Sequence, residues 1–554
     1  MSYESSESVR EDSNIKNGSD NHLIDVPPAS LEDIETYPIL SRPMIPLLAS
    51  CFLIYLVATT TGFDGSLMSS IYTQEDYLRE FNLDADSSTS TGIIFSIYNI
   101  GQIVGALFCP FIDWKGRKNV IIFGCLGVVV GAVITAVSKN IGTLLAGRFI
   151  LSFFTTLANT AAPLYVTEIA APKARARIAG CYNTLWYCGA IIAAFTAYGA
   201  NLHHSGSSLS FRLPLGIQAV CPGIVFIFGW FIPESPRWLV GVGRLDEARQ
   251  VIVNYHCNGN MDHPLVDFEM AGMEASFEGK SLQNSFRLLD PRPLFKNRNS
   301  YRSCLVIIIA FFGQFSGNNC ASYYLPTMLT KIGMTSVTTN VLMNAVYSIV
   351  AWMASIVGAF AHERIGRRKM LMFSTITAAL ALTGLAISTA RYNAIPTKAA
   401  SQSALAFIYL FGIFFSFAFT PVQVIYACEV ASNPMRSRSM IIFNITAGIA
   451  QFINQFATPT AMKNISYWFY VFYVFWDLFE CVVIYFFFVE TKSRTLEEMD
   501  EIFLAKNPRK VSVGNYEDEN DDSKKFLQYR NNAVTSISHI FSKSKVEEKV
   551  SEAV

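Results

Sequence analysis

The stretch DWKGRK, residues 113–118, follows a long apolar segment and recurs as ERIGRRK, residues 363–369, after another one. A second motif behaves in the same way, because IPESPRWL at residues 232–239 has its counterpart in FVETKSRTLEE at residues 488–498. Each recurrence comes about 250 to 260 residues after the first copy, as expected of a chain with two parallel structural repeats. The sequence therefore predicts two halves with the same order of segments.

Composition indicates what kind of protein carries these repeats. Of the 554 residues, 51% are hydrophobic and only 16% are charged, whereas about 25% of a typical soluble domain is charged. This balance favours an integral membrane protein. The formal net charge is zero, and no nucleic-acid partner is expected. The 11 cysteines show no paired CxxC spacing, so neither a metal site nor a redox site nor any cofactor is expected.

Twelve apolar segments are long enough to cross a hydrocarbon core, which takes about 20 helical residues. They are expected near residues 47–70, 91–112, 119–138, 143–166, 176–198, 214–233, 303–327, 338–361, 369–388, 404–428, 438–461 and 467–489. The predicted fold class is thus an all-α membrane protein with twelve transmembrane helices in two six-helix halves.

The charged stretches divide the chain into five predicted parts. The short loops with DWKGRKN, PKARARI, HERIGRRKM and NPMRSRS carry more Lys and Arg than the loops opposite, which places them and both tails in the cytosol. The parts are a disordered N-terminal tail (1–45), a first six-helix bundle (46–233), a cytosolic loop with short helices (234–302), a second bundle (303–489) and a cytosolic C-terminal tail (490–554).

Five motifs together carry a family resemblance. They are DWKGRK, PESPRWLVGVGR, GQFSGNN, ERIGRRK and VETKSRTLEE, and in this order and register they resemble the sugar porter branch of the major facilitator superfamily. Further segments such as SYYLPTML and YWFYVFYVF are similar to the yeast lactose permeases. The resemblance implies a major facilitator fold that works by alternating access, with a sugar site where the halves meet.

Carboxylates and arginines near the predicted cytosolic helix ends suggest a gate. Glu168 precedes Arg175 by seven positions, and Glu429 precedes Arg436 by the same spacing. Charge-assisted bonds from such pairs hold two bundles together until the carrier opens inward. The alternative is that these charges only set topology and cap helices. The predicted gate residues are Asp113, Arg117, Glu168, Arg175, Glu363, Arg367, Glu429 and Arg436.

The seventh segment carries the sugar hypothesis. Gln314, Ser316, Asn318 and Asn319 interrupt an otherwise apolar span, and amides suit sugar hydroxyls because they donate and accept together. The resemblance implies that Gln314 and Asn319 bind sugar hydroxyls. The alternative is hydrogen bonding between helices. The predicted sugar-binding residues are Gln314, Asn318, Asn319, Asn183, Gln423 and Gln451.

Three positions depart from what the resemblance implies. Gly313 stands where a second glutamine is common, Asn183 where a sugar-binding glutamine is usual, and Val424 in place of a tryptophan. Loss of the indole leaves room for a second sugar ring. We therefore expect a sugar pocket unlike that of a glucose carrier.

Asp64 in TTTGFDGSLMSS, residues 59–70, is a carboxylate inside a predicted span. Charges there are costly and point to function. Arg148 matches the family's arginine in the fourth span, and competition between burial and a nearby arginine can bring a carboxylate into the range where protons load and leave. We expect Asp64 and Arg148 to couple sugar to protons. The alternative is a permanent ion pair that only packs the first half.

Together these features predict a transporter rather than an enzyme. The expected function is import of lactose, and of galactose, with a proton across the plasma membrane, by a multi-pass protein whose partners are a sugar, protons and the lipid bilayer. Facilitated diffusion and another sugar, such as cellobiose or a hexose, remain open. A non-transporting sugar receptor is a further, less favoured alternative, because such receptors typically signal through a cytosolic tail longer than the one predicted here at 490–554.

Overall fold

The computed structural model describes residues 44–513, with gaps at 73, 84–87, 173, 278–291, 297–298, 335, 433–434, 493, 495–498, 501 and 506. These residues belong to one compact unit, Thr36–Gln528. Nearly all of the predicted N-terminal tail, most of the predicted C-terminal tail and residues 278–291 of the predicted cytosolic loop lie outside the described ranges. The division of the chain into five parts stays a prediction.

Within the described ranges the regular structure is helical, as predicted. The helices are α1 (Ile45–Ile71), α2 (Glu75–Glu80), α3 (Ser88–Leu107), α4 (Phe111–Lys115), α5 (Arg117–Val137), α6 (Ile141–Ile169), α7 (Arg175–His204), α8 (Leu209–Ile217), α9 (Val220–Phe228), η2 (Gly229–Phe231), α10 (Pro236–Gly241), α11 (Leu245–His256), α12 (Pro264–Phe277), η4 (Arg292–Phe295), α13 (Asn299–Phe315), α14 (Asn318–Lys331), α15 (Val337–Ile365), α16 (Arg367–Ala394), α17 (Lys398–Val430), α18 (Arg436–Asn464), α19 (Trp468–Phe487) and α21 (Pro508–Val513).

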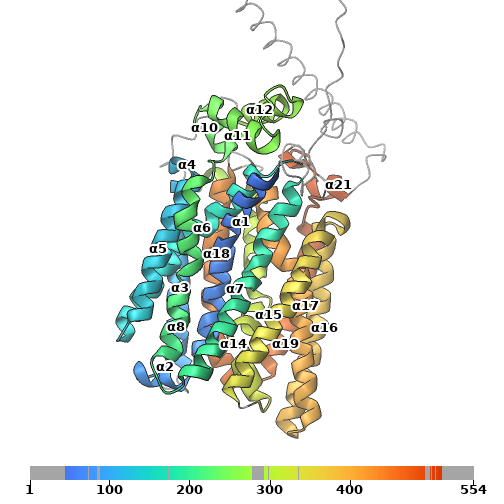
Figure 1. Ribbon diagram of the computed structural model, residues 1–554. Helices are drawn as coiled ribbons and strands as arrows, with labels where there is room; N and C mark the ends of the chain where they lie inside the picture. The colour runs from blue at the N-terminus through green and yellow to red at the C-terminus, as the bar shows by residue number, and fades with distance from the viewer. Residues whose placement is uncertain are drawn as a thin grey trace, which may run out of the picture. The chain divides into compact units, whose positions relative to one another are not determined.

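These helices supply the predicted spans. Over the described residues, 10 helical segments are long and apolar enough to cross a membrane. Helix α3 adds a shorter apolar stretch, Ile93–Leu107, and the seventh span is divided into α13 and α14. The prediction of an all-helical membrane protein is confirmed, and the long helices run side by side (Figure 1).

The seventh span breaks at the predicted sugar motif. Gly317 lies between α13 and α14 with φ of 82°, a left-handed backbone conformation that glycine adopts without strain. Tyr324 inside α14 also has non-helical angles, and Pro326 follows it. Proline removes a backbone donor and bends a helix. The polar residues of GQFSGNN therefore sit at a bend rather than along a straight helix.

The two halves repeat their helix contacts. Helix α1 packs against α7 and α5 against α6, and in the second half α13 packs against α18 and α16 against α17. Across the halves, α7 packs against α15 and α3 against α18. Matching pairs at matching places are the expected consequence of two parallel repeats.

Small residues bring α1 and α7 into close contact. A Cβ atom on Gly62 would lie 1.7 Å from the carbonyl oxygen of Trp186, and one on Gly189 would lie 1.9 Å from that of Thr59. Only glycine permits such a backbone approach, which is common between membrane helices. This contact fixes how α7 presents its side chains between the halves.

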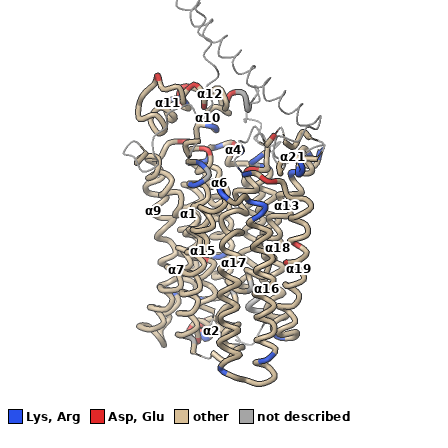
Figure 2. The backbone as a smooth tube through the Cα atoms, turned by 90° about the vertical axis from the view of Figure 1, so that its right-hand side faces the viewer, with Lys and Arg blue, Asp and Glu red and all other residues tan. Residues whose placement is uncertain are grey.

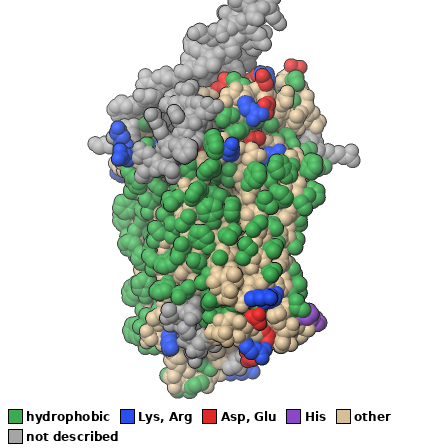
Figure 3. All heavy atoms as spheres, turned by 90° about the vertical axis from the view of Figure 1, so that its left-hand side faces the viewer, with side chains coloured by type: hydrophobic (Ala, Val, Ile, Leu, Met, Phe, Trp, Pro, Cys, Tyr) green, Lys and Arg blue, Asp and Glu red, His purple; other side chains and the backbone are tan. Residues whose placement is uncertain are grey.

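Charges and apolar side chains are separated along the helices. Lys, Arg, Asp and Glu gather at the end that carries α10, α11 and α12 (Figure 2), and we call this end the α10–α12 end. On the face seen in Figure 3, hydrophobic side chains form a broad band below it. Side chains such as Phe52, Phe475 and Leu380 are 65%, 69% and 66% exposed, as expected of residues that face lipid.

Candidate functional site

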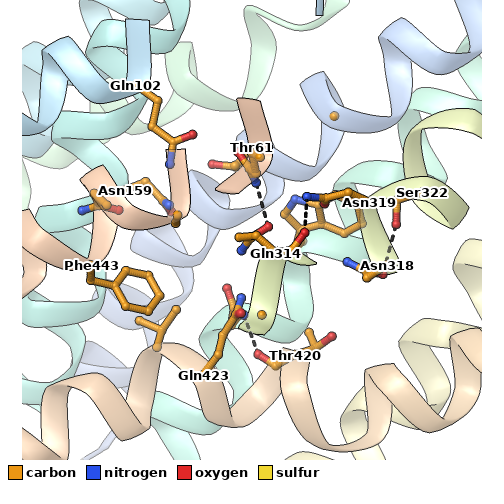
Figure 4. A pocket seen from close by; sticks show the side chains of 18 of the residues that line it. Thr61, Gln102, Asn159, Gln314, Asn318, Asn319, Ser322, Thr420, Gln423 and Phe443 are labelled. Carbon is orange, nitrogen blue, oxygen red and sulfur yellow. Dashed lines mark hydrogen bonds between the residues drawn. The ribbon is translucent and has the colours of Figure 1, made fainter. Parts of the chain in front are cut away.

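A pocket lies between the two halves and is lined by both. It contains about 1040 Å³ of unfilled space, part of it open to solvent. Figure 4 shows polar side chains around this space. The lining residues are Thr61, Gly65, Tyr98, Gln102, Thr155, Thr156, Asn159, Asn183, Trp186, Tyr187, Gly313, Gln314, Asn318, Asn319, Ser322, Phe415, Thr420, Gln423, Val424, Phe443, Asn444, Ala447 and Gln451.

The six predicted sugar-binding residues all line this one pocket. The set comprises Asn183, Gln314, Asn318, Asn319, Gln423 and Gln451. They come from α7, α13, α14, α17 and α18, segments far apart in the sequence. Their role in binding stays a prediction, but the structure brings them together as a sugar site requires.

Gln314 is the centre of a hydrogen-bond network. Its backbone carbonyl accepts from Nδ2 of Asn319 at 2.8 Å and from Nδ2 of Asn454 at 3.1 Å. Its side-chain oxygen accepts from Nε2 of Gln451 at 2.9 Å. The first two bonds satisfy the backbone carbonyl of Gln314 where α13 ends. They also hold three amides in fixed orientations at the edge of the pocket.

Gln423 occupies the space where the resemblance implies a second glutamine. A Cβ atom on Gly313 would lie 1.9 Å from Oε1 of Gln423, so any larger residue at position 313 would displace this amide. Oε1 of Gln423 is buried and has no hydrogen-bond partner among the described residues. Buried acceptors of this kind need a partner. The glycine at position 313 and the position of the Gln423 side chain therefore depend on each other.

Two polar contacts join the halves beside the pocket. Nδ2 of Asn183 donates to the carbonyl oxygen of Thr420, and the hydroxyls of Tyr187 and Ser416 lie 2.6 Å apart. Helix α7 and helix α17 therefore touch where the ligand would sit. Movement of one half against the other must change these bonds.

Sequence reasoning missed part of the pocket. Gln102, Asn159, Thr155 and Tyr98 line it from α3 and α6, and Trp186 adds an aromatic face from α7. A signal was present, because Tyr98 and Gln102, like Thr155 and Asn159, are four positions apart and so share one face of a helix. Polar residues at helical spacing inside apolar spans identify the wall of such a pocket.

The predicted proton-coupling residues are in contact. Asp64 and Arg148 are each 3% exposed, and Nη1 of Arg148 lies 3.4 Å from Oδ1 of Asp64. The same oxygen accepts a bond from Nε2 of Gln218 at 2.9 Å, which the sequence analysis did not anticipate. Arg148 also lies over the ring of Tyr98, 5.6 Å from its centre, and Tyr98 lines the pocket. The Asp64–Arg148 pair is therefore linked to the pocket through the ring of Tyr98.

In the first half the predicted gate residues Asp113, Arg117 and Glu168 form one buried cluster at the α10–α12 end. Arg117 contacts Asp113 at 3.0 Å and holds Glu168 by two bonds of 3.0 and 3.2 Å. Ser235 also donates to Glu168. Two parallel N–H to carboxylate bonds give this pair a fixed geometry.

The second half repeats this arrangement. Nη2 of Arg367 lies 2.7 Å from Oε1 of Glu429, and the hydroxyl of Thr491 donates to the other carboxylate oxygen at 2.6 Å. Thr491 therefore takes the place of Ser235. The recurrence of a hydroxyl, an arginine and a glutamate confirms that the two loops match in three dimensions as in sequence.

A third contact in each half explains the glycine of the loop motif. Backbone N–H groups of Arg117 and Lys118 donate to Glu234 at 3.0 and 3.1 Å, so this carboxylate caps the start of α5. Gly116 has φ of 93°, and a Cβ atom there would lie 2.2 Å from Glu234. The charge of a carboxylate is favourable at a helix N-terminus.

The second half has the same cap. The N–H groups of Arg367 and Arg368 donate to Glu490 at 2.8 and 3.2 Å. Gly366 has φ of 100°, and a Cβ atom there would lie 2.6 Å from Glu490. We call Glu234 and Glu490 the helix-cap glutamates.

The ion pairs of Glu168 and Glu429 described above lie within one half each. Across the halves, Glu363 of α15 pairs with Arg177 of α7 at 3.2 Å, not with Arg367 next to it in the motif. Arg436 donates to the carbonyl of Cys428 at 3.2 Å. It is also near enough to the first half to act electrostatically on Glu168. Arg175 acts in the same way on His256 of α11.

A buried histidine anchors the short helices. His256 of α11 contacts Glu269 of α12 at 2.9 Å and the carbonyl oxygen of Ile169, the last residue of α6, at 2.8 Å. Burial alone lowers the pKa of His256, but the charge of Glu269 and the two hydrogen bonds outweigh burial and raise that pKa above its ordinary value of 6.5. The charged imidazolium is therefore favoured in the folded protein.

Comparison with known proteins agrees with this architecture. A model of a family described as "Sugar (and other) transporter" matches residues 50–503. The chain is 27% identical over 467 residues to a high-affinity glucose transporter of Kluyveromyces lactis, covering 81% of this chain and 83% of the relative. It is 26% identical over 454 residues to the sugar transporter STL1 of Saccharomyces cerevisiae, covering 80% and 78%.

Solved structures show the same fold. The proton:xylose symporter XylE bound to 6-bromo-6-deoxy-D-glucose superposes with a TM-score of 0.69 at 18% identity, over 82% of this chain and 99% of that one. An inward-open structure of XylE from E. coli superposes with a TM-score of 0.65 at 18% identity, over 82% and 99%. The predicted major facilitator fold with two six-helix halves is thereby confirmed.

Proposed function

Because the chain belongs to the sugar transporter family, we propose that it imports a galactoside, lactose first and galactose second, together with a proton across the plasma membrane. The observation that carries this proposal is the pocket between the halves, in which amides from both halves surround one space. The family makes the chain a transporter and not an enzyme. The particular sugar and the proton are the proposal.

The chemistry of the pocket supports a neutral, hydroxyl-rich ligand. Amides at Gln314, Asn319 and Gln423 offer donors and acceptors together, and Trp186 and Phe443 add aromatic surface. Among the lining residues there is neither an Asp, Glu, Lys nor Arg. A charged ligand would need such a counter-charge, whereas a sugar needs amides and an aromatic face.

The width of the pocket supports a disaccharide. Val424 stands where the family resemblance implies an indole, and this smaller side chain lines the pocket. The space beside Gly313 is filled by Gln423 and adds no room. The unfilled space of about 1040 Å³ is bordered by both halves and is partly open to solvent. A second sugar ring therefore has room beside the first.

The buried cluster of Asp64, Arg148 and Gln218 supports proton coupling. Protonation of Asp64 would remove its attraction for Arg148, and Arg148 stacks on Tyr98 at the pocket wall. A bound sugar and a bound proton can thus bias the same two-state element. XylE, which shares the fold, is a proton:xylose symporter.

The α10–α12 end is inferred to be cytosolic. It carries the Lys- and Arg-rich loops, as the positive-inside rule requires. The pair between Glu363 and Arg177, which crosses the halves, must then break when the carrier opens inward. The proposed role of Arg117 with Glu168, and of Arg367 with Glu429, is to hold the loops of each half in place for that contact.

The deciding experiment measures lactose-triggered alkalinisation of a weakly buffered medium by de-energised yeast cells that express the protein. Wild type should take up protons with lactose. Asp64→Asn should exchange labelled lactose across the membrane without concentrating it. Labelled lactose entry with no proton signal in the wild type would make the protein a facilitator and Asp64 a packing residue.

A second candidate is a carrier for a different sugar. It is favoured by the names of two relatives, which are high-affinity glucose transporters of Kluyveromyces lactis and Candida albicans. Competition of labelled lactose uptake by unlabelled galactose, glucose, xylose and cellobiose separates the two candidates. If a hexose enters and lactose does not, the proposed substrate is wrong, whereas the assignment as a sugar transporter stands.

A further inference from the structure

Helix α19 carries two acidic side chains inside the membrane-spanning bundle. Asp477 and Glu480 are both 0% exposed, and at a spacing of three they share one face of the helix with Tyr473 and Ile484. The sugar pocket does not include them, and they lie outside the Asp64 cluster and the ion pairs of the loops. A structural role alone does not explain two acids in the last span.

The surroundings of the two carboxylates differ. Glu480 accepts a bond of 2.6 Å from Nε1 of Trp476. Its two carboxylate oxygens also lie 3.0 and 2.8 Å from the hydroxyl of Ser316, whose single proton they share with the carbonyl oxygen of Phe312. Both oxygens of Asp477 are buried without a hydrogen-bond partner among the described residues. One acid therefore has donors for its ionised form, and the other has none.

The arginines of the helices near Asp477 and Glu480 bond to other groups. Helix α16 packs along α19, but its Arg368 donates to the carbonyl oxygens of Ile484 and Tyr485, beyond Glu480. Arg302 of α13 pairs with Asp500. The electrostatic neighbour of Asp477 is Glu480 itself, and Tyr473 on the same face uses its hydroxyl on Asn454. No Lys, Arg or His of the described residues forms an ion pair with either acid.

The surroundings of Asp477 and Glu480 determine whether the two carboxylates are ionised. A buried carboxylate without a cation or a donor cannot stay ionised at acceptable cost, and two adjacent carboxylates cannot both be ionised. The ligand that resolves both problems is a proton. Asp477, which lacks donors, keeps its proton, whereas Glu480 has donors for an anion and so is able to lose one.

Glu480 is connected directly to the break in the seventh span. Its partner Ser316 precedes Gly317, the residue between α13 and α14, and lies two positions from Gln314 and Asn318 of the pocket. Tyr473 of α19 reaches the same place, because it donates to Asn454 and Asn454 donates to the carbonyl of Gln314. Any shift of the break therefore changes the donors available to Glu480.

We propose that Asp477 and Glu480 form a proton-binding site of the second half, in which Glu480 gains and loses a proton as the break between α13 and α14 moves. The first half has a related contact, where Gln218 of the sixth span reaches Asp64 of the first. In the second half the acid lies on the last span and its donor on the seventh. The link to sugar rests on the proposed function, whereas the protonation of the pair does not.

The protonation is tested by infrared spectroscopy of the full-length protein in liposomes between pH 5 and 9. We expect a protonated-carboxyl band that persists at neutral pH and is lost in Asp477→Asn. A second band should titrate and be lost in Glu480→Gln, and Ser316→Ala should move its titration to higher pH because the anion loses a donor. Glu269→Gln, in α12 outside the spans, is the matched control. Bands unchanged in both acid variants would overturn the proposal.

The link to sugar is tested by equilibrium binding of labelled lactose to the Asp64→Asn protein, in which the first proton site is neutral. Its dissociation constant should still change with pH, by up to about tenfold per pH unit for one linked proton, and the change should vanish in Asp64→Asn with Glu480→Gln. A dissociation constant of Asp64→Asn that is independent of pH would overturn the link. If lactose binds to no variant, the proposed substrate fails while the infrared result still decides the protonation.

Discussion

Nε2 of Gln218 lies 2.9 Å from Oδ1 of Asp64, closer than the 3.4 Å between that oxygen and Nη1 of Arg148. Asp64 is therefore held by a neutral donor on the sixth span as well as by a cation on the fourth. A hydrogen bond to a charged group contributes about 1.5 to 3 kcal/mol, so Gln218 stabilises the ionised form of Asp64.

The first prediction concerns this glutamine. Gln218→Leu removes a donor to Asp64 and should reduce the number of protons taken up per lactose, because the carboxylate loses one of the contacts that position it. Proton uptake and labelled lactose uptake, measured on the same cells, test this. Cys221→Ala, three residues further along the same span, serves as the control, and an unchanged proton-to-lactose ratio in Gln218→Leu would argue against a role in coupling.

The second prediction concerns the sugar pocket. Asn319→Ala removes an amide that lines the pocket and bonds to Gln314, and loss of about 1.5 kcal/mol corresponds to at least about tenfold weaker lactose binding. Surface expression should stay normal. The matched control is Asn340→Ala, because Asn340 is equally buried but bonds to Met334 away from the pocket. Equal binding by both variants would remove α14 from the site.

The third prediction compares two ion pairs at the α10–α12 end. Glu429→Gln breaks a largely buried pair, which costs about 3 to 5 kcal/mol, and should slow lactose turnover more than it weakens binding. Glu363→Gln breaks the pair with Arg177, whose side chain is 53% exposed, and should have a small effect of about 0.2 to 1 kcal/mol. Paired uptake and binding measurements on both variants test this contrast. The reverse order of effects would discredit the proposed gate.

The fourth prediction follows from the raised pKa of His256. A group whose pKa is higher in the folded state adds stability at low pH, and that stability is lost as pH rises through the folded-state value. Thermal stability of the purified protein should therefore decline as pH rises from the ordinary value of 6.5 through the folded-state pKa. Glu269→Gln, which removes the favourable charge, should flatten the decline. An identical pH profile in that variant would mean that the histidine does not control docking of α11.

The fifth prediction concerns packing of α1 on α7. Gly189→Ala places a Cβ atom 1.9 Å from the carbonyl oxygen of Thr59, whereas Gly199→Ala, on the same helix, meets nothing within 4 Å. Overpacking costs about 1 to 3 kcal/mol or more. Thermal stability of detergent-solubilised protein should fall for Gly189→Ala only. Equal thermal stability of the two variants would show that α1 and α7 can move apart at little cost, contrary to this prediction.

Repetition is what made the fold predictable from sequence. The copies of DWKGRK and the matching spans indicated two halves, and the structure pairs α5 with α6 and α16 with α17 accordingly. Span lengths followed from apolar runs, because lipid imposes them. Gly317 and Pro326 in the seventh span are residue types that interrupt helices, so the position of the break can be understood from the sequence.

Contacts between distant segments were harder to predict. The six predicted sugar-binding residues line one pocket between the halves, and their role in binding stays a prediction. Gln218 was not anticipated, because a single glutamine in a span gives no sign of its partner. The pairing of Glu363 with Arg177 was not anticipated either, since the two residues are far apart in the sequence. Distances across the halves depend on how the helices pack, and no local pattern encodes them.

The helix-cap glutamates have a mechanical consequence. Each one ties the loop after the last span of a half to the start of that half's third span, α5 or α16. Both tethers stay inside their own half, so each bundle has its own internal brace at the α10–α12 end. Each six-helix bundle can then move against the other as a rigid body. Loss of one helix-cap glutamate would leave one rigid bundle and one that deforms more easily.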